Sequence, residues 1–163
     1  MTHAQKDQAI SILREFDSGM LVTFPEAGAP RGRPMTMAEV DDDGAIWFVT
    51  GVDSSLLSEA ESSTRCALEL SGSRLWAHVS GRMSVVEDRE AAHRVWSDAM
   101  DAWFPDGPDS EDFALLRLEP LEVDWWDLRR GGLAKFAVAF VKARLKEERI
   151  DDDAVGSRGH ATM

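Results

Sequence analysis

The stretch 75–86 constrains the fold more than any other part of the sequence, because its side chains alternate strictly. Small or apolar residues occupy one set of alternate positions, namely Ala77, Val79, Gly81, Met83 and Val85. Polar residues occupy the other set, namely His78, Ser80, Arg82 and Ser84. Since a β-strand points successive side chains to opposite faces of a sheet, this pattern predicts a long strand with one face in the core.

Shorter apolar segments separated by turn residues predict further strands around it. We expect these strands over residues 20–24, 31–39, 46–50, 65–70, 113–118 and 123–128. The turn 25–30 contains Pro25, Gly28 and Pro30, and the acidic turn 41–44 ends in Gly44. The strand 46–50 shows no polar alternation, so both of its faces should be covered.

Three helices are expected beside these strands, over residues 2–17, 54–62 and 87–103, with Asp53 or Ser54 capping the second. Hairpins with a few helices at their edges predict a mainly β (α+β) fold, an antiparallel barrel or sandwich rather than a doubly wound sheet. The sequence contains neither a G-x-G-x-x-G motif nor a Walker motif, so neither phosphate-cradling motif supports a Rossmann or P-loop protein.

The 163 residues suffice for one domain, which we place at 1–150, followed by a polar tail at 151–163 that we expect to be disordered. Eighteen basic and 30 acidic residues give a net charge of −12. Such an acidic chain is a poor match for nucleic acid or for an anionic membrane surface. One cysteine, Cys66, excludes an internal disulfide. Without a signal peptide or long apolar run, the expected compartment is the cytoplasm.

A basic amphipathic helix is expected near the end of the domain. Its apolar stripe comprises Leu133, Phe136, Ala137, Phe140 and Val141, and its basic flank comprises Lys135, Lys142, Arg144, Lys146 and Arg149. A helix of this kind can lie on a membrane or bind a partner, but it more often packs on its own barrel or on a dimer mate.

Metal binding and nucleophilic catalysis find no support in the sequence. If Gly44 of the acidic turn 41–44 were the sixth residue of a calcium loop, the twelfth would have to be a glutamate, but it is Thr50. The residues on either side of the turn are also expected to form strands rather than helices. None of His3, His78, His93 and His160 has metal-ligand spacing with another His, Cys or carboxylate. We therefore expect no metal site and assign no catalytic residue.

One constellation does suit a ligand. Arg31 and Arg33 lie on one expected strand, the strand 46–50 follows after a hairpin, and the polar sequence Asp53-Ser54-Ser55 begins a helix. Arginine forks, serine hydroxyls and free helix-start N–H groups can together bind a phosphate. On these residues alone, surface arginines beside a capped helix remain the simpler interpretation.

The wider sequence resembles the general-stress-protein branch of the pyridoxamine phosphate oxidase-like flavoproteins. The resemblance runs over about residues 21–145 and includes "GAPRGRPMTM", "GAIWFVTGVDSS", "AHVSGRMSVVEDRE" and "AWFPDGPDSEDFALLRLEPLEVDWWD". Its most specific part is "WFPDGP" at 103–108, followed by "LEP" and "WWD". The resemblance implies an antiparallel split β-barrel with peripheral helices that forms a homodimer and holds FMN at each end of the interface.

The resemblance also implies where the flavin lies. The arginine of "RPM" and the start of the short helix would hold the phosphate, the strand 47–50 would line the ring through its backbone, and the partner chain would contribute its "WF" corner. The residues carried over in this way are Arg33, Met35, Val49, Thr50, Ser54, Ser55, Trp76, Trp103 and Phe104. Val49 and Trp76 are equally explained as core residues, and Ser54 and Ser55 as helix caps.

One departure from the family pattern concerns the phosphate. Relatives carry a lysine just after the polar start of the short helix, where this chain has Leu56. Losing one charge-assisted contact costs roughly 1.5–3 kcal/mol, or about one to two decades of affinity. Two functions therefore compete: an FMN-dependent oxidoreductase related to stress, and a non-catalytic flavin carrier, sensor or interaction module with weakened FMN binding.

Overall fold

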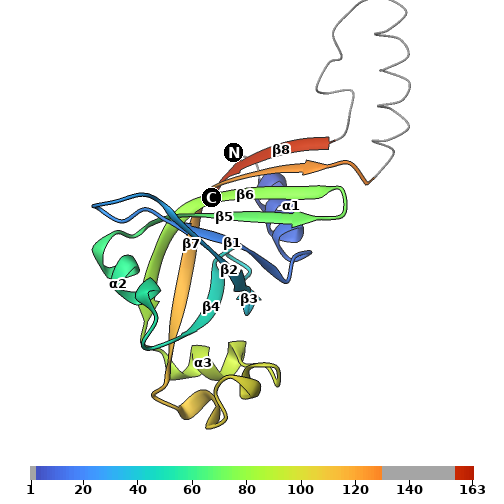
Figure 1. Ribbon diagram of the computed structural model, residues 1–163. Coiled ribbons are helices and arrows are strands. Elements are labelled where there is room, and N and C mark those ends of the chain that lie inside the picture. The colour runs from blue at the N-terminus through green and yellow to red at the C-terminus, as the bar shows by residue number, and fades with distance from the viewer. Residues whose placement is uncertain (1–2, 130–156) are drawn as a thin grey trace, which may run out of the picture.

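The computed structural model describes residues 3–129 and 157–163, and its centre is one antiparallel eight-stranded sheet (Figure 1). The strands are β1 Ser18–Thr23, β2 Arg31–Thr36, β3 Glu39–Val40, β4 Ile46–Gly51, β5 Arg65–Gly72, β6 Leu75–Val86, β7 Phe113–Asp127 and β8 Ser157–Thr162. The helices are α1 His3–Leu13, α2 Ser55–Ser62 and α3 Arg89–Val95, with short 3-10 turns η1 Met100–Ala102 and η2 Gly107–Asp109.

The strand order explains why the sheet curls. The order is β2-β1-β5-β6-β7-β4-β3, with β8 added to β7, so β2 and β3 stand at opposite ends of the sheet. Only Met37 and Ala38 separate β2 from β3 along the chain. The Ala38 N–H donates to the Trp47 carbonyl over 2.8 Å, and Met37 is 8% exposed. One bent segment thus joins the two ends of the sheet, which closes it into a split barrel and confirms the expected fold class.

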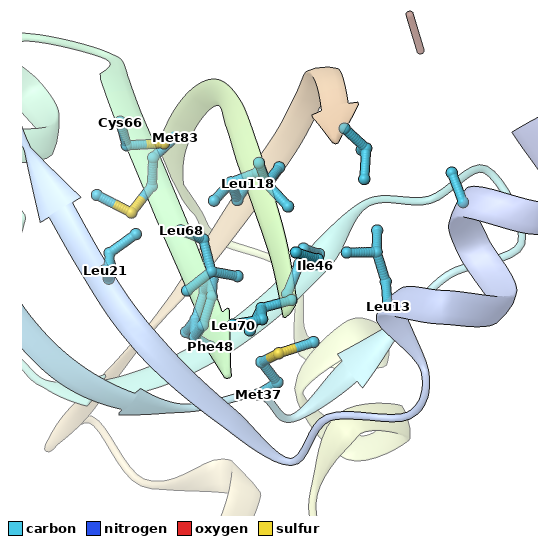
Figure 2. Packing of buried hydrophobic residues seen from close by; sticks show 14 of the residues in the cluster. Leu13, Leu21, Met37, Ile46, Phe48, Cys66, Leu68, Leu70, Met83 and Leu118 are labelled. Atoms are coloured by element: carbon cyan, nitrogen blue, oxygen red, sulfur yellow. The ribbon is translucent and has the colours of Figure 1, made fainter. Parts of the chain in front are cut away.

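The main core fills the inside of this barrel. Its apolar side chains come from the inner faces of β1, β4, β5, β6 and β7, from α1 and α2, and from Met37 and Ala161. Figure 2 shows ten of them labelled: Leu13, Leu21, Met37, Ile46, Phe48, Cys66, Leu68, Leu70, Met83 and Leu118. A smaller cluster on the outside joins Trp47 and Leu115 to Ala91, Ala92 and Val95 of α3.

The alternation in β6 appears in the structure as expected. The side chains of Ala77, Val79 and Met83 are at most 2% exposed. The intervening positions are half-buried or exposed, and Val85 is half-buried. In β4, Ile46 and Phe48 point into the barrel while Trp47 packs against α3, so both faces are covered over these residues.

The expectation of two separate closing strands is wrong, because β7 runs unbroken from Phe113 to Asp127. Its register with β6 shifts between Ser80 and Gly81, where Gly81 faces Pro120 and Ser80 faces Glu122. Proline has no N–H for the ladder and is tolerated at such a bulge. A Cβ at Gly81 would lie 2.5 Å from the Glu119 carbonyl oxygen, so the glycine permits this close approach.

The helix expected over 87–103 is also too long. α3 begins after its N-cap Asp88, whose side chain accepts from the Ala91 N–H, and it ends at Val95. Trp96 adopts an extended backbone (φ −67°, ψ 137°), and its ring packs against Phe104 and Phe113. This aromatic contact turns the chain into η1 and η2 instead of continuing the helix.

The C-terminal residues differ from the expected disordered tail. Ser157–Thr162 form β8, which pairs with Asp127 back to Glu122 of β7, so the expectation is wrong for these residues. Gly159 lies against the buried Trp125 ring, where a Cβ would clash. The basic apolar stripe expected within 133–149 lies outside the described residues. Among the residues described, no helix is long and apolar enough to span a membrane.

Candidate functional site

The two arginines predicted for a phosphate lie on the inner face of β2. Arg31 stands opposite Thr23, and Arg33 stands opposite Leu21, which is fully buried. Met35 shares this face and packs against the main core. Strand alternation therefore aims both guanidinium groups toward the end of the barrel that α2 closes.

A buried carboxylate from α2 meets these arginines. Glu59 is 6% exposed, and its Oε2 lies 2.7 Å from Nη2 of Arg33 while its Oε1 lies 3.1 Å from Nη1 of Arg31. The Thr23 hydroxyl donates to Oε2 over 2.5 Å. We call Thr23, Arg31, Arg33 and Glu59 the Glu59 cluster. Two guanidinium groups against one carboxylate leave the cluster with one net positive charge.

The ionised form of Glu59 is favoured by this environment. Burial alone would raise the pKa of Glu59, but the hydrogen bonds from Thr23 and Arg33 and the charge of Arg33 hold that pKa below its ordinary value of 4.5. Burying an ionised carboxylate this deeply without these donors would lower the stability of the folded protein. Glu59 is therefore a charged member of the cluster near neutral pH.

The start of α2 lies close to the cluster along the same helix. Ser54 is the N-cap, and its Oγ accepts from the Leu56 N–H over 3.2 Å, while Ser55 is exposed. Ser55 and Glu59 are four residues apart and share one helix face, about 6 Å along the axis. The arginines therefore lie one helical turn from the polar helix start. Leu56 is fully buried in the main core, so it presents no polar group there.

β4 has an edge that its neighbour β3 covers only in part. β3 pairs with Ile46 and Trp47, and the Trp47 carbonyl accepts from Ala38. Backbone N–H and C=O groups alternate sides along a strand, so those of Val49 point to the same side as those of Trp47. Val49 lies beyond the end of β3, so β3 does not cover these groups. The Val49 side chain packs with the α3 cluster and that of Thr50 is half-buried. The backbone of β4, rather than these side chains, is thus what this edge offers a ligand.

Six of the nine predicted site residues lie on β2, on β4 and at the start of α2; β2 contacts β4, and α2 follows β4 along the chain. These are Arg33, Met35, Val49, Thr50, Ser54 and Ser55, and the bond from Arg33 to Glu59 ties β2 directly to α2. Two arginines that could have replaced the missing lysine differ in position. Arg65 begins β5 shortly after α2, with its guanidinium 5.5 Å from the Phe24 ring centre, whereas Arg74 lies in the turn at the far end of β5.

The other three predicted residues belong to other elements of the chain. Trp76 is 37% exposed on the outer face of β6, beside Trp126. It is seven residues, roughly 24 Å of strand, from Met83 near α2. Trp103 is 81% exposed, whereas Phe104 packs on Phe113 with ring centres 5.7 Å apart. Trp76 therefore lies far along β6 from the region around Arg33, whereas Phe104 packs on Phe113, which pairs with Gly51 at the end of β4.

A separate open cleft of about 460 Å³ lies between α2, the end of β6 and α3. Apolar side chains including Leu57, Val85 and Phe113 line it, with Asp88 and Arg89 at its polar side. None of the predicted site residues lines this cleft. Within the described parts of the chain, no group of three or more His, Cys, Asp or Glu residues could hold a metal ion.

Sequence reasoning missed Glu59 and Thr23. An acid on a helix between the buried positions Leu56 and Ala60 is the one signal that could have indicated a buried ion pair. Its partners are 26 to 36 residues away along the chain, so the sequence did not indicate which residues they would be.

Fold and site together define an antiparallel split barrel whose arginine-bearing strand meets the start of a short helix. Residues 4–151 match the family model described as pyridoxamine 5'-phosphate oxidase like. The chain belongs to the pyridoxamine 5'-phosphate oxidase-like family.

Solved structures agree with this assignment. A structure named general stress protein 26 from Jannaschia sp. is 30% identical, with a TM-score of 0.74 and 96% of each chain covered. The general stress FMN/FAD binding protein from Xanthomonas citri is 26% identical, with a TM-score of 0.65, covering 77% of this chain and 89% of that one. A general stress family protein from Xanthomonas campestris is 27% identical, with a TM-score of 0.65, covering 77% and 90%. No curated protein matches the chain.

Proposed function

We propose that this protein binds FMN in a site shared by the two chains of a homodimer. The observation that carries the proposal is the position of Arg33, on the inner face of β2 and one turn from the polar start of α2. The name of the Xanthomonas citri relative, a general stress FMN/FAD binding protein, supports a flavin as the ligand.

The chemistry of the donors fits a phosphorylated flavin. Arginine has five N–H donors, and Arg33 uses one nitrogen, Nη2, for Glu59. Its other donors make no hydrogen bond to residues 3–129 or 157–163, and Ser55, one helical turn before Glu59, is exposed. These groups would hold the phosphate, and the uncovered backbone of β4 at Val49 would line the ring, with Thr50 beside it.

The exposure of Trp103 supports a contribution from a second chain. A tryptophan that is 81% exposed leaves most of a large apolar side chain in water. The next residue in the chain, Phe104, packs with Phe113 and Trp96 in an aromatic cluster. Trp103 would thus be presented to the partner's flavin, and Trp76 with Trp126 would remain on the outer sheet face.

A bound flavin supplies the electron chemistry, and the protein supplies orientation and exclusion of water. On this basis the activity we propose is that of an FMN-dependent oxidoreductase of the general stress group, working in the cytoplasm. No residue is assigned as a catalytic acid or base.

A second function is favoured by Glu59 and Leu56. The carboxylate already uses donors of both arginines, and no lysine reaches the site from position 56. Weak phosphate binding would suit a flavin carrier or sensor better than an enzyme with a resident cofactor.

The test is the visible spectrum of the purified protein, followed by titration with FMN and sedimentation of the complex. The proposal expects flavin absorption bands or saturable binding at about micromolar FMN, in a dimer with one flavin per chain. A monomer, or a protein that binds no FMN at about millimolar concentration, would overturn it. Bound flavin that no electron donor reduces would favour the carrier.

A further inference from the structure

We propose that Glu59 acts as an internal competitor for the flavin phosphate, so that it limits how strongly the site distinguishes FMN from riboflavin. The inference rests on the proposed FMN site and adds a specificity-determining residue to it. Its starting observation is geometric: Glu59 contacts the guanidinium groups of both Arg31 and Arg33.

The first step concerns charge. A phosphate monoester carries about −1.5 to −2 charges at neutral pH. The two arginines alone would match a dianion, but Glu59 reduces the cluster to one net positive charge. Leu56 is a fully buried apolar residue and adds no positive charge to the site. The charge of the cluster therefore matches a single negative charge and only partly neutralises a dianion.

The second step concerns donors. Carboxylate and phosphate oxygens bind the same arginine N–H groups in the same forked geometry. Glu59 cannot move away easily, because its carboxylate is 6% exposed and also receives the Thr23 hydroxyl. A phosphate must bind through the remaining donors of Arg33, which is 22% exposed, and of Arg31, which is 62% exposed.

The Glu59→Gln variant removes the charge and keeps the shape. The glutamine oxygen can accept from an arginine, and its amide can donate to the Thr23 oxygen. Glu61→Gln is the matched control, because Glu61 is an exposed acid on the same helix. The readout is the ratio of riboflavin Kd to FMN Kd, since a general loss of structure weakens both ligands whereas the phosphate site affects FMN alone.

We expect Glu59→Gln to raise this ratio by about one to two decades, with Glu61→Gln within about threefold of the wild type. If Glu59→Gln fails to fold, the second background is Arg31→Gln, in which Arg33 and Glu59 balance each other's charge. Arg31 is largely exposed, so its replacement should leave the fold intact. Adding Glu59→Gln to Arg31→Gln must then raise the ratio. An unchanged or lower ratio in the background that folds overturns the inference while leaving the FMN site intact.

A measurement without flavin separates the two proposals. Inorganic phosphate should raise the Tm of Glu59→Gln more than that of the wild type or Glu61→Gln, relative to sodium chloride at equal ionic strength. If no flavin binds but phosphate stabilises Glu59→Gln selectively, the FMN proposal fails and the competition by Glu59 stands. If phosphate stabilises all three proteins equally, the competition by Glu59 is refuted.

Discussion

Replacing Thr23 with valine tests the energetics of the Glu59 cluster directly. Valine has nearly the shape of threonine and suits a strand, so Thr23→Val removes one hydroxyl from a site that is 1% exposed without opening a cavity. The lost bond is a 2.5 Å hydrogen bond to a buried carboxylate. Hydrogen bonds to charged groups contribute about 1.5–3 kcal/mol, so the free energy of unfolding at pH 7 should fall by that amount.

The size of the expected change makes it measurable by urea or thermal unfolding. A domain of this length loses roughly 2–4 °C of Tm per kcal/mol, which gives a decrease of about 3–12 °C. Thr36→Val is the control, because Thr36 is exposed on β2 and its replacement should stay within about 0.5 kcal/mol of the wild type. A Thr23→Val protein as stable as the wild type at pH 7 would refute the account of the cluster.

The pH dependence gives the same prediction a second readout. The pKa of Glu59 in the folded protein is below its ordinary value. Its ionisation therefore contributes stability above the unfolded pKa, and that contribution disappears as the pH falls through the folded pKa. Thr23→Val raises the folded pKa toward the unfolded value, so the stabilities of the two proteins should converge in acid. A difference that stays constant from pH 7 to acid would contradict the role of the charge.

Two further predictions concern the core and the added strand. Burial raises the pKa of the Cys66 thiol to about 12, so it should resist a disulfide reagent at pH 8 in the native protein and react after unfolding in urea; rapid labelling of the native protein would show that the thiol is accessible. Gly159→Ala should force β8 away from Trp125, lowering the free energy of unfolding by about 1–3 kcal/mol and speeding hydrogen exchange in β8, whereas Ser157→Ala should do neither. Unchanged exchange in Gly159→Ala would mean that β8 does not depend on this close contact.

Local patterns in the sequence predicted the strands well where burial alternates. β6 has the bounds that its alternation predicts, and α2 begins at its polar cap, with Ser54 as the N-cap. The same reasoning failed at Pro120, since a proline that usually ends a strand is accommodated here by a bulge opposite Gly81. It also failed at Trp96, where contacts with Phe104 and Phe113 end a helix that the local sequence would continue.

The site could be predicted only as far as a family resemblance and local motifs reach. Those features predicted that Arg33, Val49 and Ser54 belong to one site. They gave no indication of Glu59, because a buried ion pair depends on strands that meet only after the barrel has closed. They also gave no indication that β8 completes the sheet, since its polar sequence lacks an alternating pattern.

The most direct test of a shared flavin site is complementation between two defective variants. Arg33→Gln should damage the phosphate site of its own chain, and Trp103→Ala should damage the site of the partner. In a heterodimer of the two, one site carries both changes and the other carries neither. After the two variants are mixed and exchange subunits at random, about one quarter of all sites should bind FMN with wild-type affinity. No recovery of binding on mixing, with heterodimers demonstrably formed, would contradict the shared site.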